Sequence, residues 1–180
     1  MSAEPRTRWG WHQLADDWAQ RLVNAARINP GDLVLDVGAG TGALTGPLVR
    51  TGAHVIAVEL HPRRARQLRD RFARAGVTVV QVDAADLRLP RRPFRVVANP
   101  PFGITTSLIR RLLSRGSRLV TADLVVPGHV ANRWARGSAP GADRWRQTFD
   151  ASVPCRVPGA ALRPPPPGPT AVLRIERRQT

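Results

Sequence analysis

A glycine-rich loop that directly follows a short apolar run limits the folds open to this chain. Residues 33–35 are apolar and predict a buried strand, and residues 36–42 read Asp-Val-Gly-Ala-Gly-Thr-Gly. The next residues, with Leu44 and Leu48 at helical spacing, predict a helix. Glycines at 38, 40 and 42 allow a sharp turn and bring backbone N–H groups close to a ligand at the start of that helix. This strand–loop–helix unit predicts an α/β fold that binds a ligand at the loop.

Acidic residues stand near the ends of three successive predicted strands. Asp36 precedes the first loop glycine by two positions, Glu59 ends a strand over residues 54–58, and Asp83 follows a strand over residues 77–80. These carboxylates suit an ammonium group, two ribose hydroxyls and an adenine amino group, which S-adenosylmethionine carries together. Taken singly, each acid also fits a solvated loop, and glycine patterns of this kind occur in dinucleotide-binding folds as well.

A second motif, Asn99-Pro100-Pro101-Phe102, follows the apolar residues 96–98. The prolines stiffen this turn, because Pro101 fixes its own φ and biases Pro100 toward an extended conformation. The Asn99 side-chain oxygen and the Pro100 carbonyl can then accept hydrogen bonds from both hydrogens of an exocyclic amine, which frees its lone pair for methylation. Phe102 offers a flat face on which a flipped-out base can stack. The alternative is a proline-rich turn that only ends a strand.

Together these motifs resemble the Erm ribosomal RNA adenine-N6 methyltransferases of the KsgA-like dimethyladenosine transferase superfamily. The likeness runs from about Trp9 to Arg174, and the Trp-Gly-Trp-His opening resembles the short forms found in mycobacteria. The resemblance implies methylation of one adenine in the macrolide-binding loop of 23S rRNA, with resistance to macrolides, lincosamides and streptogramin B. Rivals are a 16S rRNA adenine dimethylase, a DNA adenine or protein amide methyltransferase, and a non-catalytic RNA-binding module on the same fold.

The resemblance also assigns roles to individual residues. It implies that Asn99, Pro100 and Phe102 are catalytic. The residues expected to contact S-adenosylmethionine are His12, Leu14, Asp36, Gly38, Gly40, Glu59, Asp83 and Asn99. Two segments depart from the family pattern: the N-terminal segment over residues 11–14 reads Trp-His-Gln-Leu, and residues 162–170 replace the usual C-terminal signature.

The charge of the chain predicts a polyanionic partner. All 28 basic residues are arginine, and with 13 acidic residues the formal net charge is +15. A field of this sign and strength attracts nucleic acid, although a basic surface without a special role is the alternative. The arginines on either side of the catalytic turn in the sequence are the candidates for phosphate contacts: Arg88, Arg91, Arg92, Arg95, Arg110, Arg111, Arg115 and Arg118. We expect 23S rRNA to be the partner.

The predicted elements alternate between strands and helices through residue 126, which favours a Rossmann-like class I methyltransferase fold. We expect a mostly parallel, seven-stranded sheet flanked by helices, with the last two strands near residues 148–154 and 170–176. An amphipathic helix should run from Leu14 to about Arg27 and bury Trp18 in the core. We expect residues 137–143 to form a flexible loop, and the proline-rich residues 164–169 to lie across the substrate side.

Residues 1–10 are polar and basic and predict an N-terminal arm, and residues 11–180 predict the methyltransferase domain. Longer family members continue into a helical RNA-binding domain that this sequence does not show. The single cysteine, Cys155, rules out an internal disulfide, fits a reducing cytoplasm and is expected in the core. The histidines show no metal-ligand spacing, and no apolar run is long enough to cross a membrane. We expect a cytoplasmic monomer that uses no metal.

Overall fold

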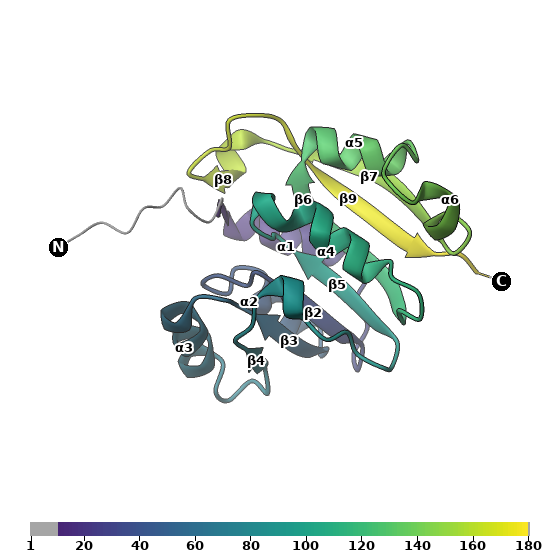
Figure 1. Cartoon of the computed structure of the whole chain (residues 1–180). Helices are drawn as coiled ribbons and strands as arrows, with labels where there is room; N and C mark the ends of the chain where they lie inside the picture. The colour runs from purple at the N-terminus through teal and green to yellow at the C-terminus, as the bar shows by residue number, and fades with distance from the viewer. Residues whose placement is uncertain (1–10, 180) are drawn as a thin grey trace.

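The computed structural model describes residues 11–179, so the predicted arm over residues 1–10 lies outside the described residues. A seven-stranded sheet forms the centre, in the order β4-β3-β2-β5-β6-β9-β7 (Figure 1). Neighbours from β4 to β6 are parallel, whereas β9 runs antiparallel to both β6 and β7. The strands are β2 (Leu33–Val37), β3 (His54–Val58), β4 (Thr78–Val80), β5 (Phe94–Ala98), β6 (Leu119–Pro127), β7 (Phe149–Val157) and β9 (Thr170–Arg177). The predicted, mostly parallel sheet is confirmed.

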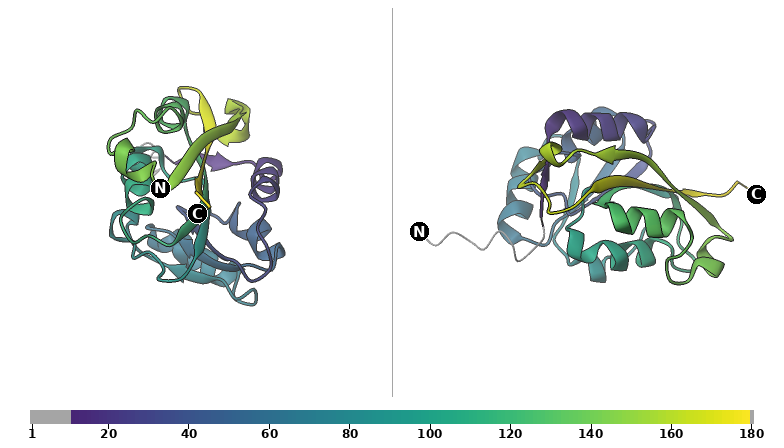
Figure 2. Two further views of the ribbon diagram at one scale, coloured as in Figure 1. Left: turned by 90° about the vertical axis from the view of Figure 1, so that its right-hand side faces the viewer. Right: turned by 90° about the horizontal axis from the view of Figure 1, so that it is seen from above.

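Helices cover both faces of this sheet. The right-hand view of Figure 2 shows α1 on one side of the sheet and α4 and α5 on the other. The helices are α1 (Asp16–Ala25), α2 (Thr45–Arg50), α3 (Pro62–Arg71), α4 (Thr105–Leu112), α5 (Gly128–Ala135) and α6 (Ala142–Trp145). Short 3₁₀ turns lie at η1 (Ala84–Asp86), η2 (Phe102–Ile104) and η3 (Gly159–Ala161). Among the described residues, no helix is long and apolar enough to cross a membrane.

The core divides into clusters on the two faces of the sheet, as strand alternation requires. In β2, Leu33, Leu35 and Val37 pack into the cluster that contains α4 and α5, whereas Val34 packs with α1 and α2. Because β2 is central and covered on both faces, all five of its residues are buried. Asp36 shares a face with Val34 and therefore lies on the α1–α2 side, where its carboxylate meets the start of α2.

A small second sheet was not predicted. β1 (Gln13–Leu14) pairs antiparallel with β8 (Leu162–Arg163), so the N-terminal segment lies beside the start of the proline-rich segment. Pro169, at the end of that segment, contacts Gly128 just after β6. Both segments therefore lie at the edge where β6 ends and β9 begins, the same edge at which the parallel strands end.

Three local predictions are wrong. Cys155 is exposed rather than in the core, because β7 is the outermost strand and its pairing with β9 is interrupted between Ser152 and Cys155. Trp18 is only half-buried; its ring packs against the α1–α2 cluster while the Arg21 guanidinium lies 5.5 Å from its centre. The first helix ends at Ala25, within two residues of the predicted end near Arg27, but it begins at Asp16, and Leu14 lies in β1.

Candidate active site at the carboxyl ends of the parallel strands

The predicted polar residues come from four strands that are neighbours in the sheet. Asp83, Glu59 and Asn99 follow β4, β3 and β5, and Asp36 is the next-to-last residue of β2. Because parallel strands end at one edge, the order β4-β3-β2-β5 brings these side chains to a common rim. This rim is where open α/β sheets bind their ligands.

The glycine loop and the Asn-Pro-Pro-Phe turn are packed directly together. Gly38 has a φ of +75°, and a Cβ atom built on it would lie 2.8 Å from Pro101 Cδ. The loop is held by the end of β3, because the N–H groups of Gly38 and Ala39 both donate to the Val58 carbonyl, at 2.8 and 3.0 Å. Gly38 is therefore required for backbone freedom and for close approach to the catalytic turn.

The Glu59 carboxylate is almost fully buried and holds the glycine loop. Its Oε2 accepts the Gly40 N–H at 2.8 Å, and its Oε1 accepts the His61 N–H at 2.9 Å and the Arg64 Nε–H at 3.3 Å. The predicted hydrogen bonds to ribose hydroxyls would have to share or replace these partners. Asp83 is more open: its Oδ1 accepts the Ala85 N–H at 2.9 Å and begins η1.

Asp36 is buried below the loop, with 1% of its surface exposed. Its Oδ2 accepts a hydrogen bond from the Thr45 hydroxyl at 2.7 Å. Burial raises the pKa of Asp36 to about 7, the Thr45 hydrogen bond opposes this, and the nearby Glu59 charge adds to it. An ammonium group would lower the pKa again, so this carboxylate suits a cationic ligand group.

Asn99 carries the least satisfied polar atom of the site. Its Nδ2 donates to the His12 carbonyl at 2.6 Å, and its Oδ1 is buried without a hydrogen-bond partner. Among the described residues, the other buried side-chain atoms without a partner are Trp145 Nε1 and Thr170 Oγ1, and neither residue lines the cavity beside Asn99. Since buried polar groups are nearly always paired, the free Oδ1 indicates an acceptor kept for a ligand.

His12 links the N-terminal segment to the catalytic turn and to the proline-rich segment. Its Nδ1 donates to the Pro164 carbonyl at 2.6 Å, and its ring centre lies 4.9 Å from that of Phe102. Phe102 is half-buried, so part of its ring remains available to a base. Leu14 is buried in the core cluster and lines the cavity beside Asn99.

Trp11 was not predicted as a site residue, and no spacing rule in the sequence singles it out. Its ring covers the glycine loop, since a Cβ on Gly40 would lie 2.9 Å from it, and the Arg64 guanidinium lies 5.0 Å from its centre. The cavity among Trp11, Leu14, Asp36 and Asn99 is only about 20 Å³. Pockets that hold drug-sized ligands are about 300–1,000 Å³, so this cavity is too small for a nucleoside, and the Trp11 ring is one of the side chains that line it.

The polar residues at this rim fit the polar groups of S-adenosylmethionine. Three carboxylates lie on adjacent strands, as an ammonium, a ribose and an adenine amino group require. Gly40 has no side chain, so a neighbouring group can approach the backbone of the loop closely, as the Trp11 ring does. Asn99 Oδ1 is a buried acceptor without a hydrogen-bond partner. Among residues 11–179, no group of three or more His, Cys, Asp or Glu side chains could hold a metal ion.

Residues 4–180 match the family model described as ribosomal RNA adenine dimethylase. The chain belongs to this family. The ribosomal RNA small subunit methyltransferase A of Synechococcus sp. (strain JA-3-3Ab) is 35% identical to it over 191 residues, which cover 97% of this chain and 68% of the relative. The mycinamicin-resistance protein MyrB of Micromonospora griseorubida is 40% identical over 181 residues, which cover 94% of this chain and 56% of MyrB.

The solved structures agree with this assignment. The crystal structure of the 23S rRNA methyltransferase ErmE superposes with a TM-score of 0.81 and 26% identity, covering 90% of this chain and 68% of ErmE. The predicted class I methyltransferase fold and the membership in the rRNA adenine methyltransferases are thereby confirmed. The relatives include both small-subunit enzymes and a resistance protein, so family membership alone leaves the target adenine open.

Proposed function

We propose that this chain transfers a methyl group from S-adenosylmethionine to N6 of a specific adenine in 23S rRNA, and so confers resistance to macrolides, lincosamides and streptogramin B. The observation that carries the proposal is the Asn99 side chain. Its amide nitrogen is fixed on the His12 carbonyl, and its buried oxygen is left without a partner beside the glycine loop. An acceptor fixed in this way suits an amino hydrogen of the target base.

The chemistry that S-adenosylmethionine supplies when bound is an electrophilic methyl group on a sulfonium. Asn99 Oδ1 and the Pro100 carbonyl accept the two N6 hydrogens, which weakens the delocalisation of the nitrogen lone pair into the ring. Phe102 stacks on the flipped adenine and fixes its plane. Asp36, Glu59 and Asp83 orient the cofactor. No protein base is required, because water takes the proton that the product nitrogen loses.

These residues act mainly by positioning and by stabilising charge, not through a covalent intermediate. Holding the nitrogen in line with the methyl group converts a bimolecular encounter into an oriented, unimolecular step. The acceptors on the stiff turn need no reorganisation during the reaction, because Pro101 packs against Gly38 and Asn99 is tied to His12. The low exposure of Asn99, 8%, strengthens its interaction with the amine.

Two comparisons favour 23S rRNA over 16S rRNA as the substrate. MyrB, whose name records resistance to mycinamicin, is 40% identical to this chain, whereas the small-subunit relative from Synechococcus is 35% identical. The ErmE structure, described as a 23S rRNA methyltransferase, superposes with a TM-score of 0.81. We propose that the enzyme works as a cytoplasmic monomer on the rRNA.

The test is to express the chain in a sensitive bacterial host and to map N6-methyladenine on both rRNAs. We expect methylation at one adenine of 23S rRNA and a raised inhibitory concentration for macrolides, with neither in an Asn99→Ala strain. Methylation confined to 16S rRNA would instead establish the small-subunit activity. If neither rRNA is methylated although the protein is folded and binds RNA, the chain is a non-catalytic RNA-binding module.

A further inference from the structure

A wide basic groove surrounds the end of α4, on the other side of the sheet from α1. One cavity of about 780 Å³ runs from Ala85 and Ser107 to the turn at Gly116. A second cavity of about 1090 Å³ continues from that turn toward Trp145 and Phe149. The two share Arg110 and the 114–118 turn, so they form one continuous surface, which we call the α4 groove.

The lining of the α4 groove is strongly one-sided in charge. The first cavity is lined by Arg91, Arg110, Arg111, Arg115 and Arg118, and the second adds Arg144 and Arg177. No acidic residue lines either cavity within the described part of the chain. A low-dielectric groove of one sign concentrates counter-charged ligands, so this groove attracts anions.

Five of the seven arginines that line the groove lie on α4, on the 114–118 turn or against that turn, and these five fall into two groups. Arg177 and Arg111 have structural roles: Arg177 donates to the carbonyls of Leu119 and Ser117 at 2.8 and 2.6 Å, and Arg111 donates to the Leu87 carbonyl. These bonds fix the turn and the helix that carry the other arginines. Arg111 is thus less available for phosphate than its sequence position predicts.

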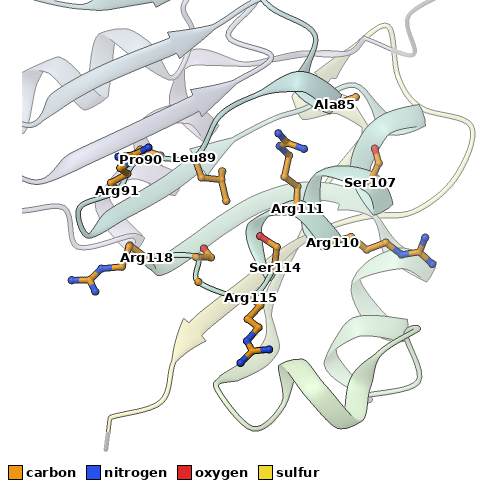
Figure 3. Close-up of a pocket in the computed structure, with 12 residues that line it drawn as sticks. Ala85, Leu89, Pro90, Arg91, Ser107, Arg110, Arg111, Ser114, Arg115 and Arg118 are labelled. Atoms are coloured by element: carbon orange, nitrogen blue, oxygen red, sulfur yellow. The ribbon is translucent and has the colours of Figure 1, made fainter.

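The second group is free to bind a ligand. Arg110, Arg115 and Arg118 are exposed, and within residues 11–179 their guanidinium groups make no hydrogen bond or ion pair. In Figure 3 these three guanidinium groups point in three different directions around the 114–118 turn. Groups that diverge cannot close on a single phosphate or a small anion. They suit a chain of separated negative charges.

The position of the groove connects it to the candidate active site. α4 begins at Thr105, directly after the η2 turn (Phe102–Ile104) that contains Phe102. Ser107, in the first turn of α4, lines the groove. The helix then runs to the opposite edge of the sheet, where β6 begins. Eight residues rise about 12 Å, which matches three to four phosphates of a stacked strand at roughly 3.4 Å each.

We propose that the α4 groove binds the sugar-phosphate backbone of the RNA that flanks the target nucleotide and leads it from the catalytic turn to the far edge of the sheet. The inference rests on the proposed function, and it adds that the substrate must extend several nucleotides beyond the methylated base. Arg110, Arg115 and Arg118 contact phosphates, and Arg177 positions the 114–118 turn that carries two of them.

The test compares two variants that lose the same charge. The groove variant replaces Arg110, Arg115 and Arg118 by Gln. The control replaces Arg66, Arg69 and Arg74 by Gln. These exposed residues of α3 and the turn after it make no hydrogen bond or ion pair within the described structure, and α3 packs on the α1–α2 side. The probes are a hairpin RNA with the target adenine in its loop and the loop oligonucleotide alone.

Affinity for both probes is measured from 50 to 200 mM salt without cofactor. Each phosphate contact adds about 0.7–0.9 to the steepness with which log affinity falls against log salt. With three contacts, the ratio of wild-type to groove-variant affinity should therefore fall about 20- to 40-fold between 50 and 200 mM salt. We expect the groove variant to lose this salt dependence for the hairpin and to bind the loop oligonucleotide nearly as wild type does. The control should keep both values, and both variants should melt as wild type does.

Equal losses in the two variants would mean that only net charge matters, and would overturn the proposal. The proposal would also be overturned if the groove variant bound the hairpin with the affinity of the wild-type chain. The groove would then serve a partner other than RNA. The binding assay needs no turnover, so its result is separate from the mapping of rRNA methylation. If the groove variant methylates 23S rRNA as well as the wild-type chain does, the proposal that the α4 groove binds RNA is refuted. The proposed function then still stands.

Discussion

Replacing Asn99 by Ala tests the central feature of the site. The change removes the buried Oδ1 that has no partner, together with the Nδ2–H that donates to the His12 carbonyl at 2.6 Å. Loss of the acceptor should act on methyl transfer, because that oxygen has no hydrogen-bond partner within the described protein. Loss of the donor should act on stability, because it leaves the His12 carbonyl without this partner.

The two effects differ in size and in the quantity that reports them. Removing one preorganised polar group from a reacting centre lowers kcat by about 10²–10³-fold, or about 2.7–4 kcal/mol. An unpaired carbonyl costs about 1–3 kcal/mol of unfolding free energy if it stays buried, and less where water reaches it. Asn99→Asp separates the two, since it keeps an acceptor at the same place but cannot donate to His12.

The assay is single-turnover transfer of a labelled methyl group to a hairpin RNA, with cofactor affinity measured by calorimetry. We expect a loss of at least about 100-fold in the transfer rate for Asn99→Ala, with a much smaller change in cofactor affinity. Thr170→Val is the control, because Thr170 Oγ1 is also buried without a partner but lies outside the cavity; its activity should be unchanged. A cofactor affinity that falls as far as the transfer rate would refute the catalytic role.

Three further predictions concern the residues around Asn99. Phe102→Ala should lower kcat/KM about ten- to hundredfold and Phe102→Tyr should keep most activity, since stacking one base is worth about 1–3 kcal/mol; a near-normal Ala variant would remove Phe102 from the site. Burial raises the pKa of Asp36 from 3.8 to about 7, so the folded chain holds this proton more tightly than the unfolded chain, and the stabilisation present at acid pH is lost as pH rises through about 7. Asp36→Asn should therefore flatten the change in melting temperature between about pH 5 and pH 8, and an unchanged profile would contradict this assignment. Trp11→Ala should tighten cofactor binding several-fold in calorimetry, because a ring that contacts Gly40 and Arg64 no longer has to be displaced. The cation–π contact with Arg64 alone stabilises the ring in place by about 0.5–1 kcal/mol. Weaker binding would show that Trp11 covers the bound cofactor.

The strand ends could be predicted from the sequence because their signals are local. Asp36, Glu59 and Asn99 each follow an apolar run of strand length, and parallel strands place such residues on one edge. The sheet order then follows from alternation of strands and helices. The hydrogen bonds that occupy Glu59 could not be foreseen in the same way, because they depend on how the loop folds back over β3.

Contacts between distant parts of the chain carry no such local signal. The pairing of β1 with β8 and the hydrogen bond from His12 to Pro164 join residues about 150 positions apart. The place of Trp11 over Gly40 depends on that pairing. Cys155 was misplaced for a related reason: its apolar neighbours suggest burial, but the outermost position of β7 leaves it exposed.

The hydrogen bond from Asn99 to His12 has a consequence for inhibition. The same short segment carries Trp11 over the glycine loop and supplies the carbonyl that orients the Asn99 amide. A ligand that displaced this segment would therefore also separate the Asn99 amide from the His12 carbonyl that orients it. A small molecule bound between Trp11 and the glycine loop would keep the segment displaced and break the hydrogen bond that orients Asn99. Such an inhibitor need not resemble either adenine or the cofactor. Substitutions in the α4 groove would not reduce inhibition by such a compound, because the compound would bind at the glycine loop.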